Sequence, residues 1–445
     1  MGPASLSSRV VQLFLVPLGG FGLLLTAPYW ASALFFNSFD RDWTGLFLVP
    51  TLVLVNIAVA ARVSRGDSVL RWLLPVGVLL KVVAASANLY VATEVYSGTA
   101  DFVHYYGSGV ALARQFQASG ELALYLPLWS SNLIRNLTGC LFILTGPCLS
   151  AAMVLFALAG LWGQYFCYRA FCTAFPDGDR RFAGLTLFLL PSLVFWPAAI
   201  GKDALVLLFL GLAVYGFAVT LRRPSLRSLL LCAAGLLGVT LVRPHISALI
   251  ATAFLGAYLM GRNLSGMAGT LRKFLLVPLL LAAAFYLVGR ARSFVELEDV
   301  SRAPEVLQRV AQAGQRGGSA FASSSTANSV LAAPLLLFRP FPWEARSLQS
   351  AGAALEGTFL LFLLWRRRRA FLTAIWNCRA NPFILFILLY TAQLLLVFSL
   401  AITNFGLLAR QRTMVMPMFV ILLASSASAT LALRRTPAAH RPGSF

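Results

Sequence analysis

The stretch PSLVFWPAAIGKDALVLLFLGLAVYGF, residues 191–217, decides how this part of the chain folds. It is apolar enough for lipid, yet Lys202 and Asp203 stand side by side in its middle. Pro191 and Pro197 disrupt an incoming helix, and the glycine before Lys202 allows a tight turn. The pattern predicts two helices joined by a turn, with Lys202 and Asp203 opening the second helix near the outer membrane interface.

The composition of the whole chain is that of a membrane protein. Of its 445 residues, 59% are hydrophobic and 11% are charged, against roughly 25% charged in soluble domains. Apolar runs of the length that a spanning helix needs recur from end to end, and they do not alternate as barrel strands do. The predicted fold class is therefore all-α: a polytopic transmembrane helical bundle in a single membrane-embedded domain, 1–445, with outer-face loops and interfacial helices.

About twelve spans are predicted from these apolar runs. Several of the runs are short or contain a proline, for example Pro75, Pro191 and Pro278, which indicates kinks. The predicted spans are residues 10–36, 45–61, 72–92, 149–168, 182–197, 203–220, 228–242, 246–261, 274–289, 351–365, 383–403 and 414–432.

The net charge of +21 follows membrane topology and does not indicate a nucleic-acid partner. Basic residues concentrate in every second connection between spans, for example in the run from Arg366 to Arg369. This positive-inside pattern places both termini in the cytoplasm and most of the basic charge near anionic lipid. Of the acidic residues, only Asp67, Asp177 and Asp179 then lie on the cytoplasmic side, so any chemistry is expected on the outer face.

The first large outer loop, 93–148, contains a predicted interfacial helix. Asp101, His104 and Tyr105 have the i, i+3, i+4 spacing that places them on one helical face, while apolar residues around Leu112 would lie on the membrane. An interfacial helix capped by Asp101, without a chemical role, is the alternative.

A second outer feature is the stretch LVRPHISAL, where a proline separates two apolar runs and holds Arg243 and His245 at the outer boundary. The positive-inside rule disfavours arginine on the outer face, so an arginine there needs a specific reason. Guanidinium groups bind phosphate oxygens, so these residues suggest a phosphate ligand. Contact with lipid headgroups alone is the alternative.

The second large outer loop, 290–350, contains LLLFRPFPWEA near its end. This stretch predicts an interfacial or re-entrant segment in which Arg339 points toward a polar cavity. Arg410 and Arg412 precede the last span on the same side.

Lys81 differs from these residues because it lies in the middle of a predicted span. An ammonium there costs about 2.5–3.5 kcal/mol on insertion scales, so Lys81 is expected to face the bundle interior. Its partner cannot be read from the sequence.

The sequence lacks the motifs of several other kinds of functional site. The six cysteines form no CxxC pair, the three histidines form no HExxH, and no nucleotide-binding fingerprint occurs. Zinc, redox and cytosolic nucleotide sites are therefore unsupported.

Two stretches resemble GT-C type membrane glycosyltransferases: TADFVHYYGSGVALARQFQASGEL, which is like their first outer loop, and the quoted segment 191–217. Here Asp101 follows the third predicted span, whereas the family's acidic residue follows the first. The O-antigen polymerase-like proteins, which also use outer-face arginines on lipid-linked sugars, are the neighbouring possibility.

The resemblance implies a donor sugar carried on a polyprenyl phosphate or diphosphate and an acceptor that is a glycan, a lipid or a protein. Asp101 would take the acceptor's proton, with His104 and Tyr105 orienting the acceptor, and Asp203 would be a second carboxylate or would position Lys202. A divalent metal is possible but not required. The cations expected at the donor phosphate are Lys202, Arg243, His245, Arg339, Arg410 and Arg412.

These residues are expected to share one pocket on the outer side of a bacterial inner membrane. The alternatives are a lipid-linked oligosaccharide polymerase, a transporter or flippase in which Lys81 belongs to a midplane pathway, and a scaffold subunit without catalysis.

Overall fold

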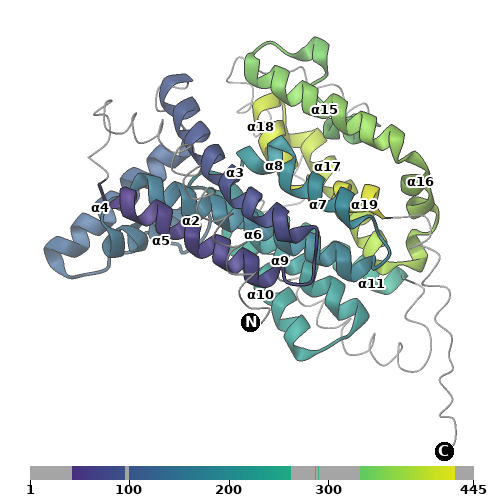
Figure 1. Cartoon of the computed structure of the whole chain (residues 1–445), viewed down its shortest axis with the longest axis horizontal. Helices are drawn as coiled ribbons and strands as arrows, with labels where there is room; N and C mark the ends of the chain where they lie inside the picture. The colour runs from purple at the N-terminus through teal and green to yellow at the C-terminus, as the bar shows by residue number, and fades with distance from the viewer. Residues whose placement is uncertain (1–42, 96–99, 262–285, 287–288, 290–330, 426–445) are drawn as a thin grey trace, which may run out of the picture. The chain divides into compact units, whose positions relative to one another are not determined.

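The computed structural model describes residues 43–95, 100–261, 286, 289 and 331–425 (Figure 1). Every regular element in these ranges is a helix. Five of these helices are long and apolar enough to cross a membrane, or six if a pair bent by 55° counts as one span. The described residues thus form an all-helical membrane protein. The predicted spans 10–36 and most of 274–289, and most of the loop 290–350, lie outside the described residues, so the number twelve stays a prediction.

The chain divides into two compact units. The first unit comprises residues Met1–Tyr165 and Phe188–Leu208, and the second comprises Phe166–Leu187 and Phe209–Phe445. Two long helices, α6 (Leu149–Ala174) and α9 (Lys202–Arg222), contribute residues to both units.

The other described elements of the first unit are helices and one short π-helical turn. They are α2 (Trp43–Val63), α3 (Leu70–Tyr90), the π turn η1 (Val91–Val95), α4 (Asp101–Ser119), α5 (Ser131–Thr145) and α8 (Pro191–Phe195).

The predicted outer loop 93–148 contains two packed helices, α4 and α5 (Figure 1). A Cβ atom added at Gly139 of α5 would lie 2.9 Å from the side chain of Leu112 on α4, so the helices approach closely because glycine leaves room there. Leu112 therefore packs on α5 and does not lie on the membrane, which corrects the prediction for this residue, whereas Val110 and Phe116 of the same predicted face are half-buried.

The remaining helices that the structure describes belong to the second unit. Its long elements are α10 (Leu226–Val242), α11 (Pro244–Met260), α15 (Leu348–Arg366) and α17 (Pro382–Ala401). The shorter ones are α7 (Arg180–Leu189, whose last two residues belong to the first unit), η4 (Ala333–Leu337), η5 (Pro342–Glu344), α16 (Arg368–Trp376), η6 (Cys378–Ala380), α18 (Phe405–Gln411), η7 (Arg412–Met414) and α19 (Met416–Ala424).

Side-chain caps start several of these helices. Ser225, Ser347 and Asn381 each accept a backbone N–H from the first turn of α10, α15 and α17. The first N–H groups of a helix have no partner within the helix, so such caps fix where it begins.

An aromatic core joins the helices of the second unit. The ring of Phe254 on α11 lies 4.1 Å from that of Phe217 and 4.6 Å from that of Phe386 on α17, measured between ring centres. Stacked and tilted aromatic pairs of this kind add to the free energy gained from burying the rings.

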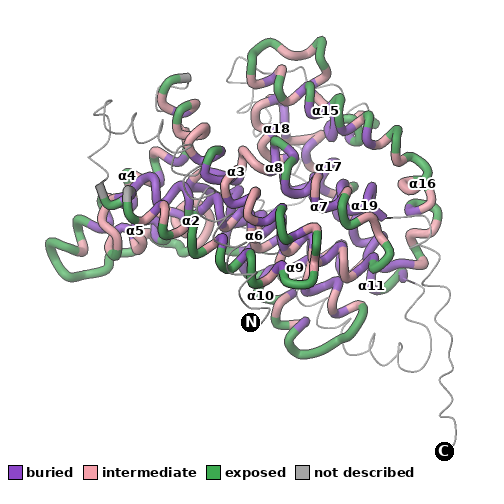
Figure 2. Tube along the Cα trace, in the orientation of Figure 1, coloured by how far each residue is buried: buried purple, intermediate pink, exposed green. Residues whose placement is uncertain are grey.

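Two predicted spans are broken. The predicted span 182–197 divides at Leu190 into α7 and the five-residue α8. The predicted span 414–432 begins at a bend: the helical segments Phe405–Met414 and Met416–Ala424 meet at an angle of 55°. Among the five unbroken candidate spans, α6 is the most buried and α15 the least (Figure 2).

Candidate functional site

The break between α8 and α9 lies where the sequence predicts it. α8 ends at Phe195, an irregular turn follows, and α9 begins at Lys202. The Nζ atom of Lys202 donates a hydrogen bond to the Ser130 hydroxyl at 2.9 Å, and Asp203 is buried, with 7% of its surface exposed. The prediction that this pair opens the second helix is confirmed.

Three polar side chains, which we call the α8 cap, hold the end of α8: Lys81, Asn88 and Gln164. Lys81 Nζ donates to the carbonyl oxygens of Leu193 at 2.7 Å and Val194 at 3.1 Å. Gln164 Nε2 donates to Leu193 O at 3.0 Å, and Asn88 Nδ2 to the carbonyl oxygen of Phe195 at 2.7 Å. The last carbonyls of a helix lack partners within it, so the cap supplies the missing donors. Lys81 is fully buried, as its position in the span predicts.

Ser130, which the sequence did not single out, has a strained backbone. Its φ of 58° with ψ of −127° is rare for a residue other than glycine and costs about 1–3 kcal/mol. This conformation presents the hydroxyl that Lys202 contacts. No sequence signal marks Ser130, because the strain arises from how the chain enters α5.

The helix that begins at Asp101 forms as predicted, but its three candidate residues differ in environment. Asp101 and His104 are exposed, whereas Tyr105 is buried. Asp101 is the first helical residue, and the N-cap position belongs to Ala100. Of the three, Asp101 and His104 are therefore placed to meet a ligand from solvent. The cap itself is Ala100 and not Asp101, while the alternative of a helix without a chemical role stays open to test.

In the second unit, an arginine cluster (Arg243, Arg339 and Arg412) forms around residues 404–414. Arg412 is buried at its centre: its Nη1 atom donates to the carbonyl oxygens of Leu337 and Arg339, each at 3.0 Å. Its Nη2 atom lies 3.4 Å from the carboxylate of Glu356, and 1% of the arginine side chain is exposed. This ion pair and the two carbonyls fix the end of η4.

The other two members of the arginine cluster have different partners. Arg243, the single residue between α10 and α11, hydrogen-bonds the side-chain oxygen of Gln411. Arg339 forms an ion pair with Glu344, and its guanidinium lies 5.2 Å from the centre of the Phe405 ring. Segments far apart in the sequence thus bring guanidinium groups to one short turn.

His245 and Arg410 lie at the edge of this cluster. His245 is half-buried at the second position of α11. Arg410 is half-buried near the end of α18, where its backbone carbonyl accepts a hydrogen bond from the Thr413 hydroxyl at 2.8 Å.

The sequence did not single out the partners of the arginines, namely Glu344, Glu356 and Gln411. Glu356 had a readable signal: it is an acidic residue inside an otherwise apolar helix, and such residues are rare and usually paired. Glu344 and Gln411 had none, because they lie at the ends of short helices, η5 and α18, where a polar residue is ordinary.

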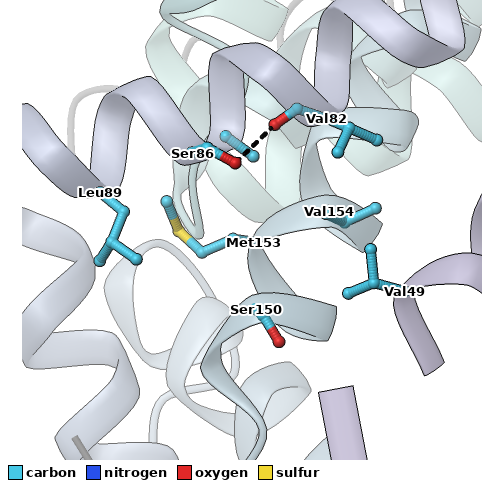
Figure 3. A pocket seen from close by; sticks show the side chains of 8 residues that line it. Val49, Val82, Ser86, Leu89, Ser150, Met153 and Val154 are labelled. Carbon is cyan, nitrogen blue, oxygen red and sulfur yellow. Dashed lines mark hydrogen bonds between the residues drawn. The ribbon is translucent and has the colours of Figure 1, made fainter. Parts of the chain in front are cut away.

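A small apolar pocket lies in the first unit between α2, α3 and α6 (Figure 3). Its volume is about 10 Å³, which is room for roughly one water molecule. It is too small and too apolar for a sugar. The residues that line it are Val49, Val82, Ala85, Ser86, Leu89, Ser150, Met153 and Val154.

Among the residues that the structure describes, no group of three or more His, Cys, Asp or Glu side chains could hold a metal ion. A divalent metal at the site therefore stays a prediction.

The predicted site residues fall into two sets. Asp101, His104, Tyr105, Lys202 and Asp203 belong to the first unit, and Arg243, His245, Arg339, Arg410 and Arg412 belong to the second. The arginines of the second set gather locally, as described above. The convergence of both sets on one pocket stays a prediction.

Comparison of the chain with known protein families, curated proteins and solved structures finds no match.

Proposed function

We propose that this protein is a membrane glycosyltransferase that moves a sugar from a polyprenyl-phosphate-linked donor to an acceptor at the outer face of a bacterial inner membrane. The arginine cluster carries the proposal. Arg243, Arg339 and Arg412, with Arg410 at their edge, gather around α18 and η7, where Arg339 pairs with Glu344, Arg412 with Glu356 and Arg243 with Gln411. Guanidinium groups bind phosphate oxygens in a bidentate way, and apolar helices give access to a phosphate carried by a lipid.

The proposed reaction is a direct transfer. The acceptor hydroxyl oxygen attacks the anomeric carbon while the bond from that carbon to the phosphate oxygen breaks, and the phosphate leaves with the bonding electrons. The hydroxyl proton passes to a carboxylate, for which we assign Asp101 because it is exposed at the start of α4. Fixed cations stabilise the charge that develops on the departing phosphate.

The remaining residues have supporting roles in the proposal. His104, exposed on the same helix, orients the acceptor. Lys202 contacts the donor phosphate, and Asp203 positions Lys202 or serves as a second carboxylate. A divalent metal bridging carboxylate and phosphate is compatible with these roles.

The first test measures transfer of labelled sugar from a polyprenyl-phosphate donor by the purified full-length protein in detergent. We expect Asp101→Asn to reduce transfer by at least about a hundredfold. Glu121→Gln, which removes another exposed carboxylate from the same outer loop, is the matched control and is expected to transfer normally. Near-normal transfer by Asp101→Asn would remove Asp101 from the mechanism.

A second test separates donor from acceptor binding. Because Arg243 is assigned to the phosphate, Arg243→Ala should raise the KM for the donor more than the KM for the acceptor, whereas Arg227→Ala, an exposed arginine at the start of α10, should change neither. Equal effects on both substrates would contradict a phosphate role.

Cysteine accessibility tests the predicted side of the membrane. With the native cysteines removed, single cysteines at positions 101, 202 and 245, which are exposed or half-buried, should all react with an impermeant reagent added from outside. Labelling of these positions from opposite sides would end the proposal of one outer pocket.

A lipid-linked oligosaccharide polymerase would use the same steps with a second lipid-linked glycan as acceptor. Products that grow by repeated units would support the polymerase, and single additions would support the glycosyltransferase.

The break at α8 favours a second candidate, a transporter or flippase of lipid-linked substrates. Broken helices with exposed carbonyls near a buried charge are a feature of transporters, and Lys81 bonds such carbonyls here. Movement of a labelled lipid-linked sugar across proteoliposomes, without transfer to any acceptor, would support it. Transfer in detergent, where there are no two compartments, would support the enzyme.

A further inference from the structure

The last turn of α15 borders an open hollow in the second unit. The hollow has a volume of about 360 Å³ and is lined by Phe182, Phe362, Leu363, Arg366 and Arg367. It therefore combines two guanidinium groups with aromatic and aliphatic walls. The positive-inside pattern places this end of α15 on the cytoplasmic side, away from the proposed transfer chemistry.

Arg367 is held in position at the edge of this hollow. It forms an ion pair with the carboxylate of Asp179, and its guanidinium lies 4.3 Å from the centre of the Phe182 ring. The other carboxylate oxygen of Asp179 accepts the backbone N–H of Phe182 at 3.0 Å. The guanidinium is thus fixed against an aromatic wall of the hollow by contacts to one carboxylate and one ring.

Arg366 differs from Arg367. It is exposed, and its side chain makes no hydrogen bond or ion pair with any other residue that the structure describes. A positive charge at the edge of a partly apolar hollow is suited to an anionic group from outside the protein.

The surroundings of the hollow suit a lipid surface. α15 is the least buried of the candidate spans, so much of its apolar surface is available to lipid. Trp365, on its last turn, is 62% exposed and lies under the guanidinium of Arg368 at 5.2 Å. Beyond it, α16 exposes Leu372 and Trp376. Exposed tryptophans and a short helix with basic and apolar residues are typical of the headgroup region.

We propose that this hollow binds the phosphate of an anionic phospholipid. Arg366 and Arg367 contact the phosphate oxygens, and Phe362 and Leu363 contact the glycerol and the first carbons of the acyl chains. The apolar walls and the exposed span beside them favour a phosphate carried by lipid over a soluble phosphate.

Native mass spectrometry of the full-length protein in detergent, titrated with phosphatidylglycerol or phosphatidylcholine, tests this inference. We expect Arg366→Gln to weaken phosphatidylglycerol binding about fivefold, the usual contribution of one basic residue near a membrane surface. Phosphatidylcholine binding should weaken less, because its choline cation offsets the charge of the phosphate. Arg227→Gln removes an equally exposed arginine from another helix and should have little effect. Equal losses in both variants would show diffuse attraction and overturn the site.

Two further arms sharpen the test. Asp179→Asn removes the carboxylate that neutralises Arg367 but keeps a side chain able to accept the Phe182 N–H. Phosphatidylglycerol should therefore bind more tightly to this variant. Unchanged or weaker binding would contradict a role for Arg367. Inorganic phosphate at millimolar concentration should not displace phosphatidylglycerol. Displacement would mean that the hollow recognises soluble phosphate and would overturn the lipid assignment.

Discussion

The α8 cap in the first unit and the centre of the arginine cluster in the second both supply hydrogen-bond donors to backbone carbonyls that lack partners within a helix. In each, a buried cation donates hydrogen bonds to carbonyls at the end of a short helix: Lys81 to Leu193 O and Val194 O of α8, and Arg412 to Leu337 O, the last of η4, and to Arg339 O just beyond it. They differ in charge balance. Arg412 is paired with Glu356, whereas no carboxylate pairs with Lys81 among the residues that the structure describes.

This difference determines what happens when a partner is lost. A buried ion pair that loses one member leaves an uncompensated charge in a medium of low dielectric constant. A cation that is held by carbonyls alone leaves only neutral carbonyls behind when it is removed, and neighbouring amides can take over some of them. The second unit is therefore expected to be more sensitive than the first.

The largest effect is expected for Glu356→Gln. Because Arg412 would remain buried and charged without its carboxylate, we expect a loss of about 3–5 kcal/mol in the free energy of unfolding, measured by denaturant titration in mixed micelles. Glu344→Gln is the matched control, since its partner Arg339 is partly exposed, and it should cost much less. Equal losses in the two variants would contradict a special role for the buried pair.

Lys81→Met is expected to have a smaller effect, about 1–3 kcal/mol in the same assay. Methionine fills a similar volume, and Leu193 O keeps Gln164 as a donor, so only the Val194 carbonyl is left without its bond. If Lys81→Met costs as much as Glu356→Gln, the proposed difference between the two clusters is wrong.

Asn88→Leu should cost about 0.6 kcal/mol, the average for a side-chain hydrogen bond in a membrane protein. It removes the bond to Phe195 O, which keeps the Ala198 N–H as a donor at 3.1 Å, and a bond to Ala84 O within α3, but no charge. A loss comparable to that of Lys81→Met would mean that the amide, and not the cation, holds the end of α8.

The Asp179–Arg367 pair should give the smallest effect, visible as a pH dependence of thermal stability. Burial acts to raise the pKa of Asp179, but the hydrogen bonds from Arg367 and the Phe182 N–H and the charges of Arg367 and Arg181 lower it overall. A carboxyl whose pKa is lower in the folded protein stabilises the fold above its ordinary pKa of roughly 4. This contribution disappears as the pH falls through the lowered pKa.

Melting curves between neutral and acidic pH measure this contribution. Asp179→Asn should reduce the loss of stability on acidification slightly, because more than a third of the carboxylate is exposed and solvent screens its charge. The same acid dependence in the variant and the parent protein would show that Asp179 is not the group responsible.

Several features could be predicted from particular residues. Pro191, Pro197 and the glycine before Lys202 predicted the break before α9, and Pro244 predicted the break that leaves Arg243 between two helices, because proline removes a backbone donor and excludes the continuous helix. The charge of Lys81 in an apolar run predicted that it faces the interior.

The partners of these residues could not be predicted. Nothing near Lys81 in the sequence indicates Leu193, more than a hundred residues away, and nothing near Arg412 indicates the carbonyls of η4. The apolar face of α4 was assigned to lipid, since the pattern of one helix does not distinguish a lipid contact from the neighbouring α5 that Leu112 actually meets.

The sequence by itself determined that the chain is an apolar, helical membrane protein and that helices break before α9 and before α11, because these properties depend on composition and on local backbone chemistry. Only the tertiary structure decided which carbonyls receive the buried cations, which arginines share one turn and which carboxylate balances Arg412. These pairings depend on how distant helices pack, and a polar group in an apolar interior is stable only with whichever partner that packing brings within hydrogen-bond distance.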